Sequence, residues 1–320
     1  MIKREIPQEL LEKMRLSDED LSSRYQQALT AEYWRRLCPK TPLEKGTERF
    51  LKVLVPGDLD SIDQAVTGLN SRGYFEAHGL FPRAATELMT ECVKTVTAAG
   101  WPAVFAFVYD PFWAVTRGPY LTSLLSTVLG AQYSVMMCRC WCYYVPPIRG
   151  ANGWAPHTDA YTAHPHRVTI WVPLTDATLD NGCIYVVPKD LIYREGPPGE
   201  DPLISEMLSR GYSLELLQRC RALPVDAGSV LGWDSQTIHW GSTCHSPTEP
   251  RISIGCEFVS KGSAAVSHES SQLFPGEPAE VLPSFTQRIK SIGQSLQIFG
   301  GWELRTQRFA ELGRRLAELS

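Results

Sequence analysis

The 320-residue sequence has no uninterrupted apolar stretch of about 18 residues, the length that a membrane-spanning helix needs. Its N-terminus, Met1-Ile-Lys-Arg-Glu-Ile, also lacks the apolar segment of an export signal. Neither sign of charge dominates, because 31 lysines and arginines against 35 aspartates and glutamates leave a formal net charge of −4. With a pI near 6.0, no broad cationic surface is expected for nucleic acid or an anionic membrane. We therefore expect a cytoplasmic protein with neither nucleic acid nor membrane among its partners.

A disulfide framework is not indicated either. The nine cysteines are an odd number, scattered through a sequence without an export signal, which favours reduced thiols. Cys138, Cys140 and Cys142 alternate along one predicted strand, a spacing that could suggest a soft-metal site. Because they lie in an apolar run with no second cysteine pair nearby, we expect them to be buried structural residues.

Repeats, low-complexity tracts and a proline- or serine-rich linker are also absent. The composition, with 43% hydrophobic and 21% charged residues, is that of a globular protein able to bury a large core. We therefore expect one domain over residues 1–320, with a mainly helical N-terminal part (1–130), a strand-rich core (131–260) and C-terminal helices (261–320).

Helical periodicity marks both ends of the sequence. Ser17, followed by Asp18, Glu19 and Asp20, is a predicted N-cap with acidic residues in the first helical turn. Apolar residues then repeat at helical spacing in two N-terminal and two C-terminal segments. These segments are 59–69, 85–96, 285–299 and 309–319.

From Tyr133 onward, short runs rich in Val, Ile, Tyr, Trp and Cys alternate with Pro, Gly and Asn-Gly, which is typical of strands and turns. Many short strands of this kind predict a sandwich or barrel. A polar insertion at 189–224, with a predicted helix from about Leu203 to Cys220, separates the later strands and is long enough to be functional. The predicted strands are Tyr133–Val145, Trp154–Tyr161, Val168–Leu174, Cys183–Val187, Ser229–Trp233 and Ile252–Val259.

Two potential metal ligands lie close together in Trp154-Ala-Pro-His-Thr-Asp-Ala-Tyr161. On a strand, His157 and Asp159 point to the same face, about 7 Å apart at the backbone, and can bind one ion. Because so short a pattern arises readily by chance, a third ligand is needed. His239, which follows an apolar strand and a turn, is the best candidate for the second histidine of a two-histidine, one-carboxylate triad. Such a triad leaves metal positions open for further ligands.

An arginine and a serine follow the second histidine. Arg251 opens a predicted strand twelve residues after His239, and Ser253 shares its face. A guanidinium can bind the distal carboxylate of 2-oxoglutarate through two parallel hydrogen bonds, and a serine hydroxyl can add a third. Arg251 alone could be a solvated arginine at a strand end, but its position after His239 favours a co-substrate site.

Four motifs, in order, resemble the phytanoyl-CoA dioxygenase family of iron and 2-oxoglutarate oxygenases over roughly residues 58–260. They are Leu69-Asn-Ser-Arg-Gly-Tyr-Phe75, the His157/Asp159 pair, the segment from Trp171 through Asn181-Gly182 to Pro188, and His239 with Arg251. The sequence departs from the family after Pro188, where Lys189-Asp190 replaces the usual Gly-Ser-His or Gly-Thr-His. It also shows no cationic cluster for the phosphates of coenzyme A.

The resemblance implies an α+β fold with a double-stranded β-helix core of the jelly-roll type, flanked by N- and C-terminal helices. It implies Fe(II) bound by His157, Asp159 and His239 at the open mouth of that core, with 2-oxoglutarate and O2 as co-substrates. Arg251 and Ser253 would bind 2-oxoglutarate, and Trp171 matches a position near it. An aspartate at 159 argues against a halogenase, in which a small residue stands at that position.

We therefore expect a dioxygenase that oxidises a small organic metabolite, such as a biosynthetic intermediate or a modified amino acid, while 2-oxoglutarate is decarboxylated to succinate and CO2. Hydroxylation is the default outcome, and desaturation, ring formation and epoxidation remain open. The 189–224 insertion and the N-terminal helices would form the substrate lid, in a monomer or homodimer. Two alternatives remain: a zinc hydrolase that uses the same three ligands, and a catalytically silent binding protein on the same scaffold. The first gives no role to Arg251 and Ser253, and the intact triad argues against the second.

Overall fold

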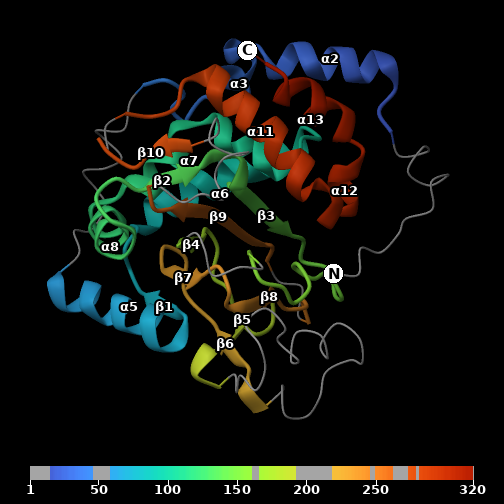
Figure 1. Cartoon of the computed structure of the whole chain (residues 1–320). Coiled ribbons are helices and arrows are strands. Elements are labelled where there is room, and N and C mark those ends of the chain that lie inside the picture. Colours follow the sequence, from blue (N-terminus) through green and yellow to red (C-terminus); the bar gives the residue numbers. More distant parts are fainter. Residues whose placement is uncertain are drawn as a thin grey trace.

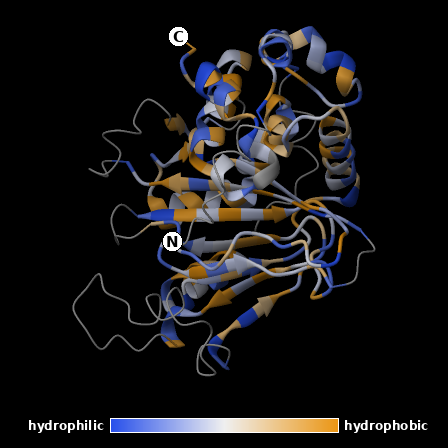
Figure 2. Ribbon diagram, turned by 90° about the vertical axis from the view of Figure 1, so that its right-hand side faces the viewer, coloured by the Kyte–Doolittle hydropathy of each residue, from blue (hydrophilic) through white to orange (hydrophobic). Residues whose placement is uncertain are grey.

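The computed structural model describes residues 15–45, 58–160, 166–191, 218–245, 249–261, 273–278 and 281–319. A large antiparallel sheet lies at the centre, with helices against one face and a three-stranded sheet on the opposite side (Figure 1). The view turned by 90° shows the same layers, with the helices above the strands (Figure 2). This arrangement of two packed sheets within an α+β fold agrees with the expected jelly-roll core.

The helices come from both ends of the chain, as the periodicity predicted. Ser17 caps the first one by accepting a hydrogen bond from the Asp20 backbone N–H at 3.1 Å. Ser284 and Gln287 form a reciprocal capping box at the start of the long C-terminal helix. The α-helices are α2 (Asp18–Ala28), α3 (Ala31–Leu37), α5 (Leu59–Arg72), α6 (Arg83–Ala98), α7 (Asp110–Ala114), α8 (Pro119–Leu129), α11 (Phe285–Phe299), α12 (Leu304–Gln307) and α13 (Ala310–Ala317).

The strands form two sheets. The large sheet has the order β1-β7-β4-β9-β2-β10, with β3 also paired to β9, and the small sheet has the order β6-β5-β8. The strands are β1 (Tyr74–Ala77), β2 (Ser134–Met136), β3 (Trp141–Val145), β4 (Arg167–Pro173), β5 (Ile184–Val187), β6 (Arg221–Leu223), β7 (Val230–Asp234), β8 (Ile238–Gly241), β9 (Arg251–Val259) and β10 (Leu273–Pro275).

The two faces of the large sheet pack against different layers, as the residues of β9 show. All nine of its residues are buried, because helices cover one face and the small sheet covers the other. Ile252, Ile254, Cys256 and Phe258 belong to the core that the helices share with the sheet. The alternate residues, which include Arg251 and Ser253, therefore point to the space between the sheets. Trp171 on β4 and Trp233 on β7 belong to the second core, which lies on that side.

The structure corrects several sequence predictions. The described part of the predicted strand Trp154–Tyr161, residues 154–160, is not a regular strand: Pro156 lacks the N–H that a ladder requires, and residues before and after it make only isolated bridges. The predicted strand Tyr133–Val145 is interrupted by a 3-10 turn at Met137–Arg139. Four short strands, β1, β6, β8 and β10, were not predicted as strands, since three or four residues carry little periodic signal.

Other predictions are confirmed or lie outside the described residues. Cys138, Cys140 and Cys142 are buried, and all nine cysteines are free thiols. No helix in the described ranges is long and apolar enough to cross a membrane. Residues 192–217, most of the predicted insertion and its helix, are outside the part of the chain that the structure describes.

Candidate metal centre and co-substrate site

The two histidines are brought together by a backbone bridge. The segment before His157 runs antiparallel to β8, and His157 and His239 exchange both backbone hydrogen bonds, at 3.1 and 3.0 Å. The centroids of their rings are 4.3 Å apart. The two histidines are therefore placed by pairing between β8 and a separate segment, and not by the alternation of side chains along one strand.

Asp159 is oriented from the inner face of the large sheet. Its Oδ2 accepts a hydrogen bond from the Thr169 hydroxyl at 2.6 Å and another from Trp233 Nε1 at 2.8 Å. Its Oδ1 lies 3.7 Å from His157 Nε2 and 3.6 Å from His239 Nε2. One carboxylate oxygen is thus held by the protein, and the other faces the two imidazoles.

The tautomers of both imidazoles follow from their neighbours. His157 Nδ1 lies 2.7 Å from the carbonyl oxygen of Ala155, and His239 Nδ1 lies 3.0 Å from that of Thr237. Because a carbonyl oxygen only accepts, each Nδ1 carries the proton and each Nε2 presents a lone pair. Two lone pairs and a carboxylate oxygen, all within 4.8 Å of one another, repel one another unless a cation lies between them. The donor set fits Fe(II).

Burial and charge keep these groups in their ligating forms. Burial and the neighbouring His239 together lower the pKa of His157 to about 4. For Asp159, burial favours the protonated acid, but His239, His157 and the hydrogen bonds from Thr169 and Trp233 outweigh it, so its pKa is lowered. At neutral pH His157 is therefore a neutral imidazole and Asp159 a carboxylate.

Arg251 is an isolated buried cation, not the solvated strand-end residue considered above. It is 1% exposed, and burial lowers the pKa of its guanidinium to about 10, so it remains charged at neutral pH. Its Nη1 donates to the Ser253 hydroxyl at 3.1 Å. Its Nε is buried without a hydrogen-bond partner, and no ion pair with a carboxylate is present among the described residues. A buried guanidinium of this kind requires an anionic partner, which fits the distal carboxylate of 2-oxoglutarate.

The space around Arg251 is set by close backbone packing and one aromatic ring. A Cβ atom on Gly153 would lie 2.9 Å from Arg251 Nη2, and one on Gly241 would lie 3.0 Å from it. The guanidinium carbon lies 5.8 Å from the centroid of the Trp171 ring. Ser253 and Trp171, both buried, are thus neighbours of Arg251, as the sequence prediction requires.

Sequence reasoning missed Tyr143. On β3 it pairs in register with Ser253, and it is only partly buried although it belongs to both cores. Burial raises the pKa of Tyr143, and the nearby Asp159 raises it further, so the phenol stays protonated and can donate a hydrogen bond. Cross-strand register with Ser253 could have identified it, but only once the pairing of β3 with β9 was known.

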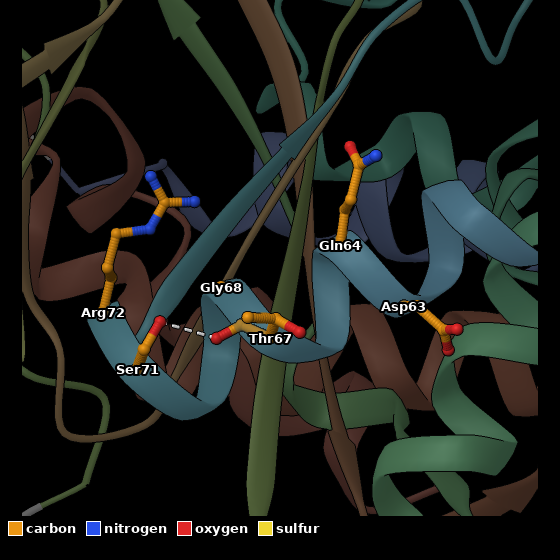
Figure 3. Close-up of a pocket in the computed structure, with 6 residues that line it drawn as sticks. All are labelled: Asp63, Gln64, Thr67, Gly68, Ser71 and Arg72. Atoms are coloured by element: carbon orange, nitrogen blue, oxygen red, sulfur yellow. Dashed lines mark hydrogen bonds between the residues drawn. The ribbon is translucent and has the colours of Figure 1, made fainter.

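A separate depression on the outer face of α5 does not contain the cluster. Figure 3 shows the side chains that line it, and Ser71 donates there to the Thr67 carbonyl oxygen at 2.7 Å. Its lining residues are Asp63, Gln64, Thr67, Gly68, Ser71 and Arg72.

Comparisons with known proteins agree with the fold. The family model described as phytanoyl-CoA dioxygenase (PhyH) matches residues 104–253. The epimerase SnoN, solved with Fe3+, α-ketoglutarate and nogalamycin RO, is similar with 16% identity and a TM-score of 0.52, covering 65% of this chain and 86% of that one. The α-ketoglutarate-dependent carbocyclase SnoK from nogalamycin biosynthesis is similar with 17% identity and a TM-score of 0.51, covering 72% and 98%. No curated protein matched the chain.

Proposed function

We propose that this chain, which resembles the phytanoyl-CoA dioxygenase family over residues 104–253, is a non-haem iron and 2-oxoglutarate-dependent oxygenase that hydroxylates a small organic metabolite. The reaction is coupled to decarboxylation of 2-oxoglutarate to succinate and CO2. His157, Asp159 and His239 are the proposed iron ligands, and Arg251, Ser253 and Trp171 form the proposed co-substrate site.

The observation that carries this proposal is the proximity of two complementary groups. Three donor atoms that converge within 4.8 Å of one another call for a cation, and a buried guanidinium in the same inter-sheet space calls for an anion. Iron and 2-oxoglutarate, which bind each other, satisfy both needs together. A hydrolytic zinc site would use the three donors but leave Arg251 buried and unpaired, and a silent binding protein would have no use for the donors.

Each residue has a distinct part in this reaction. Bound iron would supply the activation of O2 for C–H oxidation. Asp159 and the two imidazoles hold one side of the centre, and the Thr169 and Trp233 hydrogen bonds fix the direction of the carboxylate. Arg251 and Ser253 orient the far end of 2-oxoglutarate, and the surrounding buried side chains exclude water.

The test is anaerobic reconstitution with Fe(II) and 2-oxoglutarate. We expect the weak visible charge-transfer band of the chelate, followed by succinate release when O2 and a substrate library are added. Zinc-supported hydrolysis without O2 uptake would instead favour the hydrolase, and the absence of both activities would favour a binding protein.

Further features extend the proposal. All nine cysteines are free thiols, which suits the reducing cytoplasm. We propose that the protein acts there on a small molecule, as a monomer or homodimer, without nucleic acid and as one domain. The insertion at 189–224, which the sequence predicts to be part of a lid, lies mostly outside the described residues.

A further inference from the structure

The side of the site nearest His157 is aromatic and is built from two distant parts of the chain. The ring of Trp302 stacks on that of Trp154, with centroids 5.2 Å apart. The centroid of His157 lies 5.2 Å from that of Trp302 and 5.9 Å from that of Trp154. Trp154 and Trp302 are only partly buried, whereas the side chain of His157 is 9% exposed. Apolar ring surface is therefore available directly beside a proposed iron ligand.

Packing contacts and a hydrogen bond hold the two tryptophans in place. Trp154 packs against Phe299 at 5.1 Å and against Tyr143 at 4.9 Å between centroids. Trp302 ends the 3-10 turn Gly300–Trp302, whose first carbonyl accepts a hydrogen bond from the Thr306 hydroxyl at 2.7 Å. These contacts fix a large aromatic surface in place, so a ligand that stacks on it need not order it first.

The next residue, Glu303, adds to the support. Its Oε1 accepts a hydrogen bond from Trp141 Nε1 at 3.0 Å, which ties the turn to β3. The indole rings of Trp302 and Trp154 carry no charge, so this wall offers a ligand a stacking surface but no ion pair.

We propose that Trp302 and Trp154 are substrate-binding residues, and that the substrate presents an uncharged planar ring system to them. This inference rests on the proposed function, because it places the ring next to the iron. Aromatic stacking, rather than ion pairing, then selects the compound that is oxidised.

The test uses 2-naphthol as a planar uncharged probe and decahydro-2-naphthol as its saturated, non-planar counterpart. Both are titrated calorimetrically, without O2, into the protein loaded with Fe(II) and 2-oxoglutarate and into metal-free protein. We expect 2-naphthol to bind more tightly than the saturated probe. Loss of one stacking ring in Trp302→Ala should weaken 2-naphthol binding roughly tenfold, and Trp302→Phe should restore most of it.

The matched control is Trp240→Ala. Trp240 is also partly buried and neighbours His239 on β8, but it stacks on Tyr185, on the opposite face of that strand from the histidine. We expect unchanged 2-naphthol affinity in this variant. The proposal is overturned if wild-type protein does not bind 2-naphthol, if Trp302→Ala binds it as tightly as wild type, or if both alanine variants lose it equally.

The experiment distinguishes failure of the proposed iron site from failure of the proposed ring binding. The charge-transfer band of Fe(II) and 2-oxoglutarate is recorded before each titration. A missing band with 2-naphthol binding that still depends on Trp302 in metal-free protein would refute the iron site and keep the ring-binding wall. A normal charge-transfer band together with 2-naphthol binding that does not depend on Trp302 would keep the iron site and refute the ring-binding wall.

Discussion

At the scale of single residues, the proposed iron site depends on three side chains, and no other described group can take over the role of one that is removed. His239→Ala should lower Fe(II) affinity by at least about 100-fold, since loss of an outer hydrogen-bond partner alone costs about 10- to 100-fold. The fold should persist, because the pairing of β8 with β5 does not need the imidazole. Calorimetric Fe(II) titration under anaerobic conditions measures this effect.

The control for this prediction is His245→Ala, which removes an exposed histidine a few residues further along the chain. It should bind Fe(II) like wild type. Equal Fe(II) affinity in folded His239→Ala protein would remove His239 from the proposed site.

Arg251 offers a second prediction at this scale. Arg251→Lys keeps a positive charge but cannot form two parallel hydrogen bonds with a carboxylate. We expect roughly a 10- to 100-fold loss of 2-oxoglutarate affinity, from one or two lost charged hydrogen bonds, with Fe(II) affinity nearly unchanged. Titration of the charge-transfer band with 2-oxoglutarate gives both values.

Arg149→Lys is the matched control, because Arg149 is exposed. If Arg251→Ala also kept full 2-oxoglutarate affinity, the co-substrate would be bound by another cation.

At the scale of elements, the site requires that β8 and the segment before His157 approach closely. A Cβ atom on Gly241 would lie 2.9 Å from the Gly153 Cα and 3.0 Å from Arg251 Nη2. Gly241→Ala should therefore separate the two backbones and displace the guanidinium. We expect about 1–3 kcal/mol lower unfolding free energy and weaker 2-oxoglutarate binding. Denaturant unfolding and the charge-transfer titration measure the two effects.

Gly301→Ala is the comparison, because a Cβ atom on Gly301 would meet nothing within 4 Å. It should leave both quantities near wild type. An unchanged 2-oxoglutarate affinity in Gly241→Ala would mean that the guanidinium is not confined by this packing.

The segment that contains His157 and Asp159 shows what the sequence could not predict. The structure brings the side chains of His157 and Asp159 together, but the regular strand predicted to align them is absent from residues 154–160. The bridge to β8 sets His157, and Thr169 and Trp233 set Asp159. These partners are 10 and 74 residues away from Asp159, so no local periodicity could reveal them.

At the scale of the whole molecule, a buried ion pair joins the two helical ends of the chain. Arg288 on α11 donates to Asp110 on α7 at 2.6 Å, and both residues are 2% exposed. Asp110 also accepts the backbone N–H groups of Glu44 and Lys45. Asp110→Ala leaves Arg288 charged without this partner, so we expect a loss of about 3–5 kcal/mol in unfolding free energy. Denaturant unfolding measures this loss.

An exposed pair provides the control. Glu87→Ala removes the contact of Arg83 with Glu87, whose side chains are 74% and 69% exposed, and should change the unfolding free energy by less than about 1 kcal/mol. Similar small losses in both variants would show that Asp110 does not hold the two ends together.

The sequence by itself determined the helices at both ends, most of the long strands and the identity of the potential ligands. Helix α11 has the predicted bounds, and β9 begins at Arg251 as predicted, because amphipathic periodicity and capping residues are local signals. Only the tertiary structure decided the pairing of β8 with the segment before His157, the burial of Arg251 and the place of Trp302 beside the proposed ligands. Each depends on contacts between distant segments, whose registers are set when the two sheets and the C-terminal helices pack together.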